Sequence, residues 1–423
     1  MPDDILIINA SELVTLKGPK RARAKREMSD LAIVRDGALA ISGGVIVDVG
    51  RTESVLKEHD SQGVERIDAS GKLVMPGFVD PHTHLVYGGS REFELEFKAK
   101  GKSYLEILKG GGGILRTVKD TRAASASDLF HQSARRLESM IAHGSTTIEA
   151  KSGYGLDRDS ELKILETTRK LADDYPADIV PTFLGAHAVP SEYEGCPDDY
   201  LSFVIEDVLP EVRKRKLAEF CDVFCEKGVF TADQSRRVLL AAKELGMKLK
   251  VHADEFKASG GAELAAEVGA VSADHLARPS DDGLMALVRK DVVGVLLPGT
   301  PYSSMSKEYA DGRRLIDLGI PVALGTDLNP NCWNESMQFT ISLACHKMRM
   351  TPAEAITAAT INSAAAVGME KRVGTLERGK RGDVIVLDVP SHAHVPYRFG
   401  TNLCSTVVKD GRVVWEKAAS LDS

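Results

Sequence analysis

Features that would indicate a disulfide-stabilised protein are scarce in this 423-residue sequence. Its six cysteines are too few and too scattered to form a disulfide scaffold in so long a chain. Cys221 and Cys225 are spaced CxxxC, but no second pair accompanies them to complete a zinc knuckle. We therefore expect the cysteines to be buried free thiols.

The sequence also lacks the apolar runs of membrane-spanning and exported proteins. No run approaches the length of a membrane span, and the opening stretch, MPDDILIINA, lacks the charged-then-apolar order of a signal peptide. Basic residues are in deficit too, since 61 acidic against 54 basic side chains give a net charge of −7. That balance gives no reason to expect nucleic-acid or membrane binding. We expect a soluble cytoplasmic protein.

Both ends of the chain have the composition of short strands. DILIINA, GALAISGGVIVDVG and RIDASGKLVMPG near the start, and GDVIVLDVP and STVVKDGRVVWE near the end, are rich in Ile and Val. The KDGR between two apolar stretches indicates a hairpin turn. These ends predict one small β-domain built from residues 1–75 and 376–423. The basic run 17–27 has the composition of a solvated loop, and we assign it no function.

The middle of the chain, 76–375, alternates short apolar strands with amphipathic helices. The expected strands are GFVDPHTH, TTIEAKS, DIVPTFLGAH, CDVFCE, KLKVHADE, AVSADHL, VVGVLLP and PVALGTD. Helical patterns such as DSELKILETTRKLADD and TADQSRRVLLAAKELG lie between them. Eight strands in this cadence predict a (β/α)8 barrel. A doubly wound sheet is the rival, but no GxGxxG opens any of the helices.

Polar side chains concentrate where the predicted barrel strands end, which is where such barrels carry their chemistry. A single histidine at a strand end is more often a hydrogen-bonded structural residue than a ligand. Five of the 11 histidines nevertheless fall at these ends, and independent structural placement explains that clustering poorly. The five are His82, His84, His187, His252 and His275.

A divalent metal prefers several neutral imidazoles and a carboxylate, with a position left open for water. Three imidazoles and one carboxylate of this kind come from strands one, five and eight: His82, His84, His252 and Asp327. Glu255 follows His252 closely enough to move a proton from a water to a leaving nitrogen, although a Glu there could also cap a helix. His275 could polarise a carbonyl under attack.

The stretches PGFVDPHTH, VHADE and GTDLNP resemble the amidohydrolase superfamily, a group of metal-dependent barrels with a split β-sandwich. The resemblance covers the whole chain, and the ordered trio of HxH, His and Asp makes it specific. Binuclear members carry a bridging lysine on strand four, whereas CDVFCEKG has none within the strand. The resemblance therefore implies one metal ion, zinc or iron(II), on His82, His84, His252 and Asp327. An approach of Glu226 or Lys227 to the site stays open.

Further segments resemble the ring-opening hydrolases of histidine degradation within that superfamily: DPHTHLVYGGSRE, GGGILRTV, TIEAKSGYGL, TFLGAHAVP, FCEKGVF and LGTDLNPN. This resemblance implies hydrolysis of a cyclic amide C–N bond, converting 4-imidazolone-5-propanoate to N-formimidoyl-L-glutamate. It implies catalytic roles for Glu255, His275 and Asp327. It also suggests a homodimer.

The propionate of that substrate suits a guanidinium, and Arg91 is the best candidate, with a salt bridge to Glu92 or Glu94 as its structural alternative. Further residues resemble the family's substrate contacts: Tyr154, His187, Glu255, Asn329, Asn331 and Cys332. Some members have Gly and Ser where this chain has Asn331 and Cys332, so these two contacts could be made by the backbone.

Two rival functions remain. An aminohydrolase that deaminates cytosine or guanine would use the same HxH, HxxE and Asp, but Arg91 and KSGYGL suit a carboxylate tail that a free base lacks. A non-catalytic scaffold would be expected to miss a ligand or the glutamate, and none is missing.

Overall fold

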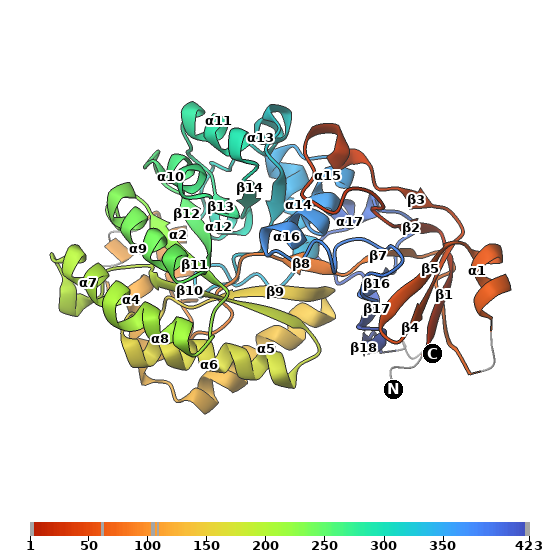
Figure 1. Ribbon diagram of the computed structural model, residues 1–423, viewed down its shortest axis with the longest axis horizontal. Helices are drawn as coiled ribbons and strands as arrows, with labels where there is room; N and C mark the ends of the chain where they lie inside the picture. The colour runs from red at the N-terminus through yellow and green to blue at the C-terminus, as the bar shows by residue number, and fades with distance from the viewer. Residues whose placement is uncertain (1–3, 61–62, 103–105, 108–109, 419–423) are drawn as a thin grey trace.

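The core of the protein is an eight-stranded parallel barrel. The computed structural model describes residues 4–60, 63–102, 106–107 and 110–418. Each expected barrel strand is present, and the (β/α)8 class is confirmed (Figure 1). The strands follow chain order from β8 to β15: Phe78–Asp80, Ser145–Lys151, Asp178–Ala186, Phe220–Cys225, Lys248–Ala253, Ser272–His275, Val293–Leu296 and Val322–Leu324.

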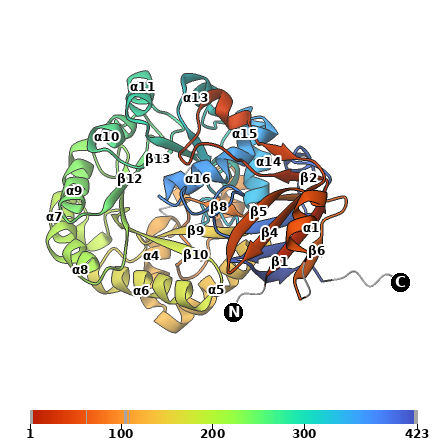
Figure 2. The same cartoon turned by 45° about the vertical axis from the view of Figure 1, so that its right-hand side comes forward.

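The barrel strands are almost wholly buried because helices cover them on the outside, and this explains their continuous apolar runs. Figure 2 shows the helices as a ring around the strands. The described helices of the barrel and its loops are α2 (Glu94–Ala99), α4 (Ile114–Ala123), α5 (Ala126–Ala142), α6 (Arg158–Asp174), α7 (Pro197–Phe203), α8 (Leu209–Lys214), α9 (Ala232–Glu244), α10 (Gly261–Val268), α11 (Asp281–Lys290), α12 (Gly299–Ser303), α13 (Gly312–Leu318), α14 (Met337–Met348), α15 (Pro352–Ala358) and α16 (Ile361–Ala366).

The barrel closes through the segments that follow β8 and β15. Asp327 N donates to His82 O at 3.0 Å, and His84 N donates to Leu328 O at 2.8 Å. These bonds place the HxH pair directly beside Asp327. The first and last strands of the barrel therefore meet where three of the predicted metal ligands, His82, His84 and Asp327, lie.

Strands from both ends of the chain form two further sheets beside the barrel (Figure 1). A four-stranded sheet contains β1 (Ile5–Ala10), β4 (Gly37–Ser42), β5 (Val45–Arg51) and β6 (Glu65–Asp68), with α1 (Thr52–His59) packed against it. A six-stranded sheet combines β2 (Glu12–Val14), β3 (Ile33–Val34) and β7 (Leu73–Pro76) with β16 (Val384–Leu387), β17 (Cys404–Lys409) and β18 (Arg412–Glu416). The limits 1–75 and 376–423 stay a prediction.

The basic run 17–27 is not the fully solvated loop that we expected. Arg23 is buried, and its backbone N donates to Asn362 Oδ1 at 2.7 Å on the barrel side. Its guanidinium donates to the carbonyls of Leu16 and Asp30. These carbonyls accept from Nη1 and Nη2 of the buried guanidinium, and charge alone did not reveal that such acceptors would converge.

No helix in the described ranges of the chain is both long enough and apolar enough to cross a bilayer.

Candidate metal centre and active-site pocket

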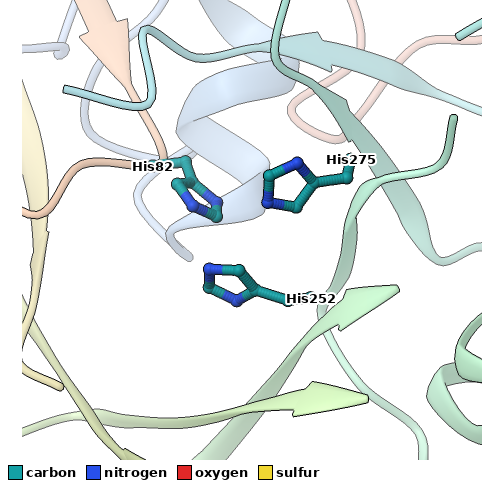
Figure 3. Close-up of side chains that lie close together, drawn as sticks. All are labelled: His82, His252 and His275. Carbon is teal, nitrogen blue, oxygen red and sulfur yellow. The ribbon is translucent and has the colours of Figure 1, made fainter. Parts of the chain in front are cut away.

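Histidines from three strands converge at the carboxyl end of the barrel. Figure 3 shows His82, His252 and His275 with their rings turned toward one another. The His82 and His252 ring centroids are 4.6 Å apart, and those of His252 and His275 are 5.2 Å apart. At this end of the barrel, three groups of side chains have ligand atoms within 4.8 Å of one another: His82, His252 and His275; His84, His187 and His252; and His82, His84 and Asp327.

The four predicted ligands face one common space. Asp327 Oδ1 lies 3.6 Å from His82 Nε2 and 3.7 Å from His84 Nε2. Nε2 of His82 and Nε2 of His252 are buried without a hydrogen-bond partner. Because an unpaired buried acceptor is costly, this orphaned set fits a bound cation.

Acidic side chains from other barrel strands lie against two of these rings. Asp274 Oδ2 accepts a hydrogen bond from His82 Nδ1 at 2.6 Å, and Asp222 Oδ2 lies 3.0 Å from His252 Nδ1. A carboxylate at Nδ1 fixes the tautomer in which Nε2 carries the free lone pair. The two rings are thereby prepared to bind a metal through Nε2.

Burial favours the neutral form of His82, His84 and His187. Burial, together with the surrounding cationic groups, lowers the pKa of His82 and of His84 well below the ordinary value. Burial likewise lowers the pKa of His187 to about 3. Neutral imidazole is the form that binds metal, so these shifts agree with the ligand chemistry.

Asp327 is held by Thr300 of α12 and by Asn329 of its own loop. Burial raises its pKa above the usual range, and hydrogen bonds from Thr300 and Asn329 oppose that rise. Thr300 Oγ1 donates to Asp327 Oδ2, which leaves Oδ1 toward the two histidines. The carboxylate therefore presents one oxygen to the predicted metal position.

Glu255 and His275 lie on the same side of the site. Glu255 Oε2 is 3.7 Å from His275 Nε2, and 14% of the Glu255 side chain is exposed toward the cavity. Burial, with Asp327 and Glu226 nearby, raises the pKa of Glu255 well above its usual range. A carboxyl with a raised pKa that borders a cavity suits proton transfer.

Residues with positive φ turn the chain at these strand ends. His275 has φ 73°, Leu276 has φ 52° and Asp327 has φ 51°. Non-glycine residues rarely adopt this left-handed conformation because it costs free energy, and residues strained in this way cluster at functional sites. The strained turns direct His275 and Asp327 into the pocket.

A cavity of about 700 Å³ opens above the histidines. Its wall includes most of the predicted substrate contacts: Arg91, Tyr154, His187, Glu255, Asn329 and Asn331. His187 stacks on His84 with ring centroids 4.9 Å apart, and its Nδ1 donates to Gly153 O at 3.0 Å. This volume suits a small molecule.

Arg91 is buried at the cavity wall rather than on the surface. Its Nε and Nη2 donate to Glu94 at 2.7 and 2.9 Å, so the salt bridge and the pocket position coexist. Glu94 Oε1 also accepts from Gly113 N at 2.7 Å, at the start of α4. These bonds fix the guanidinium and leave Nη1 outside the pair with Glu94.

Cys332 does not line the cavity. Its Sγ faces Thr326 O at 3.7 Å, and its backbone N donates to Asn329 within the same turn. Glu226 does line the cavity, but its carboxylate accepts hydrogen bonds from the 255–259 loop. Among the described residues, Glu226 belongs to no group of His, Cys, Asp and Glu side chains close enough to hold a metal ion, and Lys227 lines the cavity beside it.

Sequence reasoning missed two contributors to the site. Asp222 lies within the apolar strand FCDVFC. An acidic residue inside such an apolar run could have indicated its role in the site. Lys98 lines the cavity, and its Nζ lies 2.6 Å from Asn331 Oδ1. No local pattern pointed to Lys98, because the contact joins a residue of α2 to a residue of the loop after β15.

One known protein family matches most of this chain. A family model described as the amidohydrolase family matches residues 73–414. The chain belongs to the amidohydrolase family. Members of this family bind metal ions in the active site. The resemblance seen in the sequence is confirmed.

Two relatives that share about half of their residues with this chain have the same description. The imidazolonepropionase of Alkaliphilus metalliredigens (strain QYMF) is 49% identical over 417 residues, covering 98% of this chain and 98% of that protein. The imidazolonepropionase of Geobacillus kaustophilus (strain HTA426) is 51% identical over 414 residues, covering 97% of each. An adenosine deaminase structure from Xanthomonas campestris with bound zinc has a TM-score of 0.71 at 17% identity, covering 97% of this chain and 93% of that one. At 17% identity that likeness concerns the fold alone.

Proposed function

We propose that this protein hydrolyses 4-imidazolone-5-propanoate to N-formimidoyl-L-glutamate. The proposal rests on a sequence identity of 49–51%, over nearly the full length, to proteins named imidazolonepropionase. A cavity lined by histidines is the structural observation that agrees with it. Water adds to the ring carbonyl carbon, the ring C–N bond breaks, and the ring nitrogen takes a proton. The substrate is a small molecule of a size that the cavity accommodates.

One divalent ion, zinc or iron(II), is the proposed cofactor. His82, His84, His252 and Asp327 would hold it, and the orphaned Nε2 atoms support that assignment. The ion supplies Lewis-acid polarisation and a lowered water pKa when bound. Zinc and iron(II) suit this ligand set alike.

Side chains of the protein carry out the proton transfer and stabilise the developing negative charge. Glu255 takes the proton of the attacking water and delivers it to the departing ring nitrogen. His275, directed into the pocket by its left-handed backbone, hydrogen-bonds the oxygen that gains negative charge. Asp327 assists proton removal from its place beside His82 and His84.

The propionate is proposed to bind at Arg91. Its guanidinium is fixed by Glu94 and lines the cavity, so a carboxylate can pair with the remaining donors. Tyr154, His187, Asn329 and Asn331 would contact the rest of the substrate. A contribution of Cys332 is limited to shaping the turn that carries the two asparagines. The homodimer and the cytoplasmic location stay predictions.

The test is a turnover assay with imidazolone propanoate, cytosine and guanine as parallel substrates. We expect ring opening of the first alone, lost after chelation and restored by zinc or iron(II). Turnover of a base without turnover of the imidazolone would overturn the proposal. Full activity in protein shown by elemental analysis to be metal-free would overturn the metal assignment.

A further inference from the structure

A cluster of buried charges lies beneath the histidines, and the proposed reaction does not use it. At its centre Lys151, the last residue of β9, places Nζ 2.7 Å from Glu149 Oε1. The same Nζ lies 2.8 Å from Asp222 Oδ2 and 3.6 Å from Asp274 Oδ2. All four side chains are fully buried.

The two aspartates near Lys151 are the ones that face the histidines. Asp222 Oδ2 is 3.0 Å from His252 Nδ1, and Asp274 Oδ2 is 2.6 Å from His82 Nδ1. In both carboxylates, the oxygen that faces the imidazole is also the oxygen that faces the ammonium.

The other oxygen of each aspartate is held by its own surroundings. Asp222 Oδ1 accepts from the backbone N of Val223 at 2.8 Å and of His252 at 3.1 Å. Asp274 Oδ1 accepts from Ser272 Oγ at 2.6 Å. Each carboxylate is thus fixed at Oδ1, and its Oδ2 is shared between Lys151 and one histidine.

Lys151 is charged in this setting. Burial by itself would lower its pKa, but Asp222, Glu149 and Asp274 outweigh burial and raise it above the ordinary value. Lys250 is the other buried cation of the cluster, and its Nζ reaches only 4.0 Å from Asp274 Oδ2 while donating to Ala366 O at 3.1 Å. Lys151 is therefore the cation that contacts both histidine-facing carboxylates most closely.

We propose that Lys151 is a positioning residue for the metal ligands. Its ammonium holds Asp222 and Asp274 in place from β9, and those carboxylates hold His252 and His82 with Nε2 toward the metal. Two ligands on separate strands thereby depend on one side chain that touches neither metal nor substrate. The inference rests on the proposed metal-dependent function.

The test compares Lys151→Met with Lys250→Met, the same substitution at a second fully buried lysine. Metal-free protein is titrated with zinc against a chromophoric chelator, and thermal unfolding is recorded without metal. We expect Lys151→Met to weaken zinc affinity by about 10–100-fold, as loss of an outer-sphere partner does, and Lys250→Met to change it by less than about threefold. Both substitutions should lower thermal stability, because each leaves buried carboxylates with less compensation.

A double variant keeps the test decisive if Lys151→Met does not fold. Asp222→Asn combined with Lys151→Met removes one charge of each sign, and its zinc affinity should fall below that of Asp222→Asn by less than about tenfold, because only the link from Lys151 through Asp274 to His82 is left to lose. A loss of zinc affinity in the double variant equal to the product of the two single losses would overturn the proposal. Unchanged zinc affinity in Lys151→Met, or equal losses in Lys151→Met and Lys250→Met, would also overturn it. If the wild-type protein itself binds no zinc or iron, the proposed function fails. If the wild type binds metal and opens the ring while Lys151→Met matches it, only the positioning role fails.

Discussion

At the scale of single residues, the site is defined by which atoms have partners and which do not. Nδ1 of His82 donates to Asp274, Nδ1 of His252 lies 3.0 Å from Asp222 Oδ2, and Nε2 of each ring has no hydrogen-bond partner. Glu255 has a raised pKa and borders the cavity beside His275. The chemistry of the site thus follows from a few side-chain environments rather than from any single motif.

Replacing Glu255 with glutamine should abolish most turnover while leaving the fold and the metal in place. The amide cannot carry the proton between water and the ring nitrogen, and we expect kcat to fall by about 10²–10⁴-fold. Steady-state kinetics with elemental analysis of the same preparation measure both properties.

Glu226→Gln is the matched control for that variant, because Glu226 also lines the cavity but is engaged by the 255–259 loop. We expect its kcat to fall by less than about tenfold, since it transfers no proton. Equal losses in the two variants would show that Glu255 has no distinctive role in proton transfer.

At the scale of elements, the segment between β8 and α4 determines how Arg91 is presented. Glu94 on α2 pairs with Arg91 and also accepts from Gly113 N at the start of α4. One buried carboxylate therefore links Arg91 to the start of α4. The arrangement depends on the fork geometry of the guanidinium.

Substituting Arg91 by lysine should raise KM by at least about tenfold while kcat changes by less than about threefold, because a point charge cannot pair with Glu94 twice and also reach the propionate. Steady-state kinetics over a wide substrate range separate the two constants. The control is Arg116→Lys, an exposed arginine of α4 whose partner is Asp120. A KM unchanged by Arg91→Lys would remove Arg91 from the substrate site.

At the scale of the whole molecule, the charge of the cavity opposes that of the protein. The chain has a net charge of −7, yet its cavity wall carries five cationic side chains: Arg91, Lys98, Lys102, Lys227 and Lys257. Three acidic side chains share that wall: Glu226, Glu255 and Asp327. A cavity lined by one dominant sign attracts ligands of the other sign.

We expect kcat/KM for the anionic substrate to fall several-fold as salt rises from roughly 0.02 to 0.5 M, with kcat nearly constant, because salt screens the attraction. The double variant Lys227→Gln with Lys257→Gln should flatten this dependence. Lys57→Gln with Lys371→Gln, the same charge change on exposed lysines away from the cavity wall, should leave it intact. A salt response equal in both double variants would contradict steering by the rim.

The sequence by itself determined the eight barrel strands, their order and the residue types at their ends. Apolar runs and helical periodicity are local signals, and His82, His84, His252 and Asp327 stand at the ends of such runs. That is why the barrel and the candidate ligands could be predicted before any contact was known. The catalytic and binding roles of those residues stay predictions until they are tested.

Only the tertiary structure decided which side chains act together. Lys151, Asp222 and Asp274 come from three strands, and their contacts exist only because the closed barrel directs all three side chains inward. The same holds for the burial of Arg23 and for the turn that directs Cys332 away from the cavity. Such contacts depend on register, side-chain direction and chain closure, whereas sequence patterns report only on near neighbours.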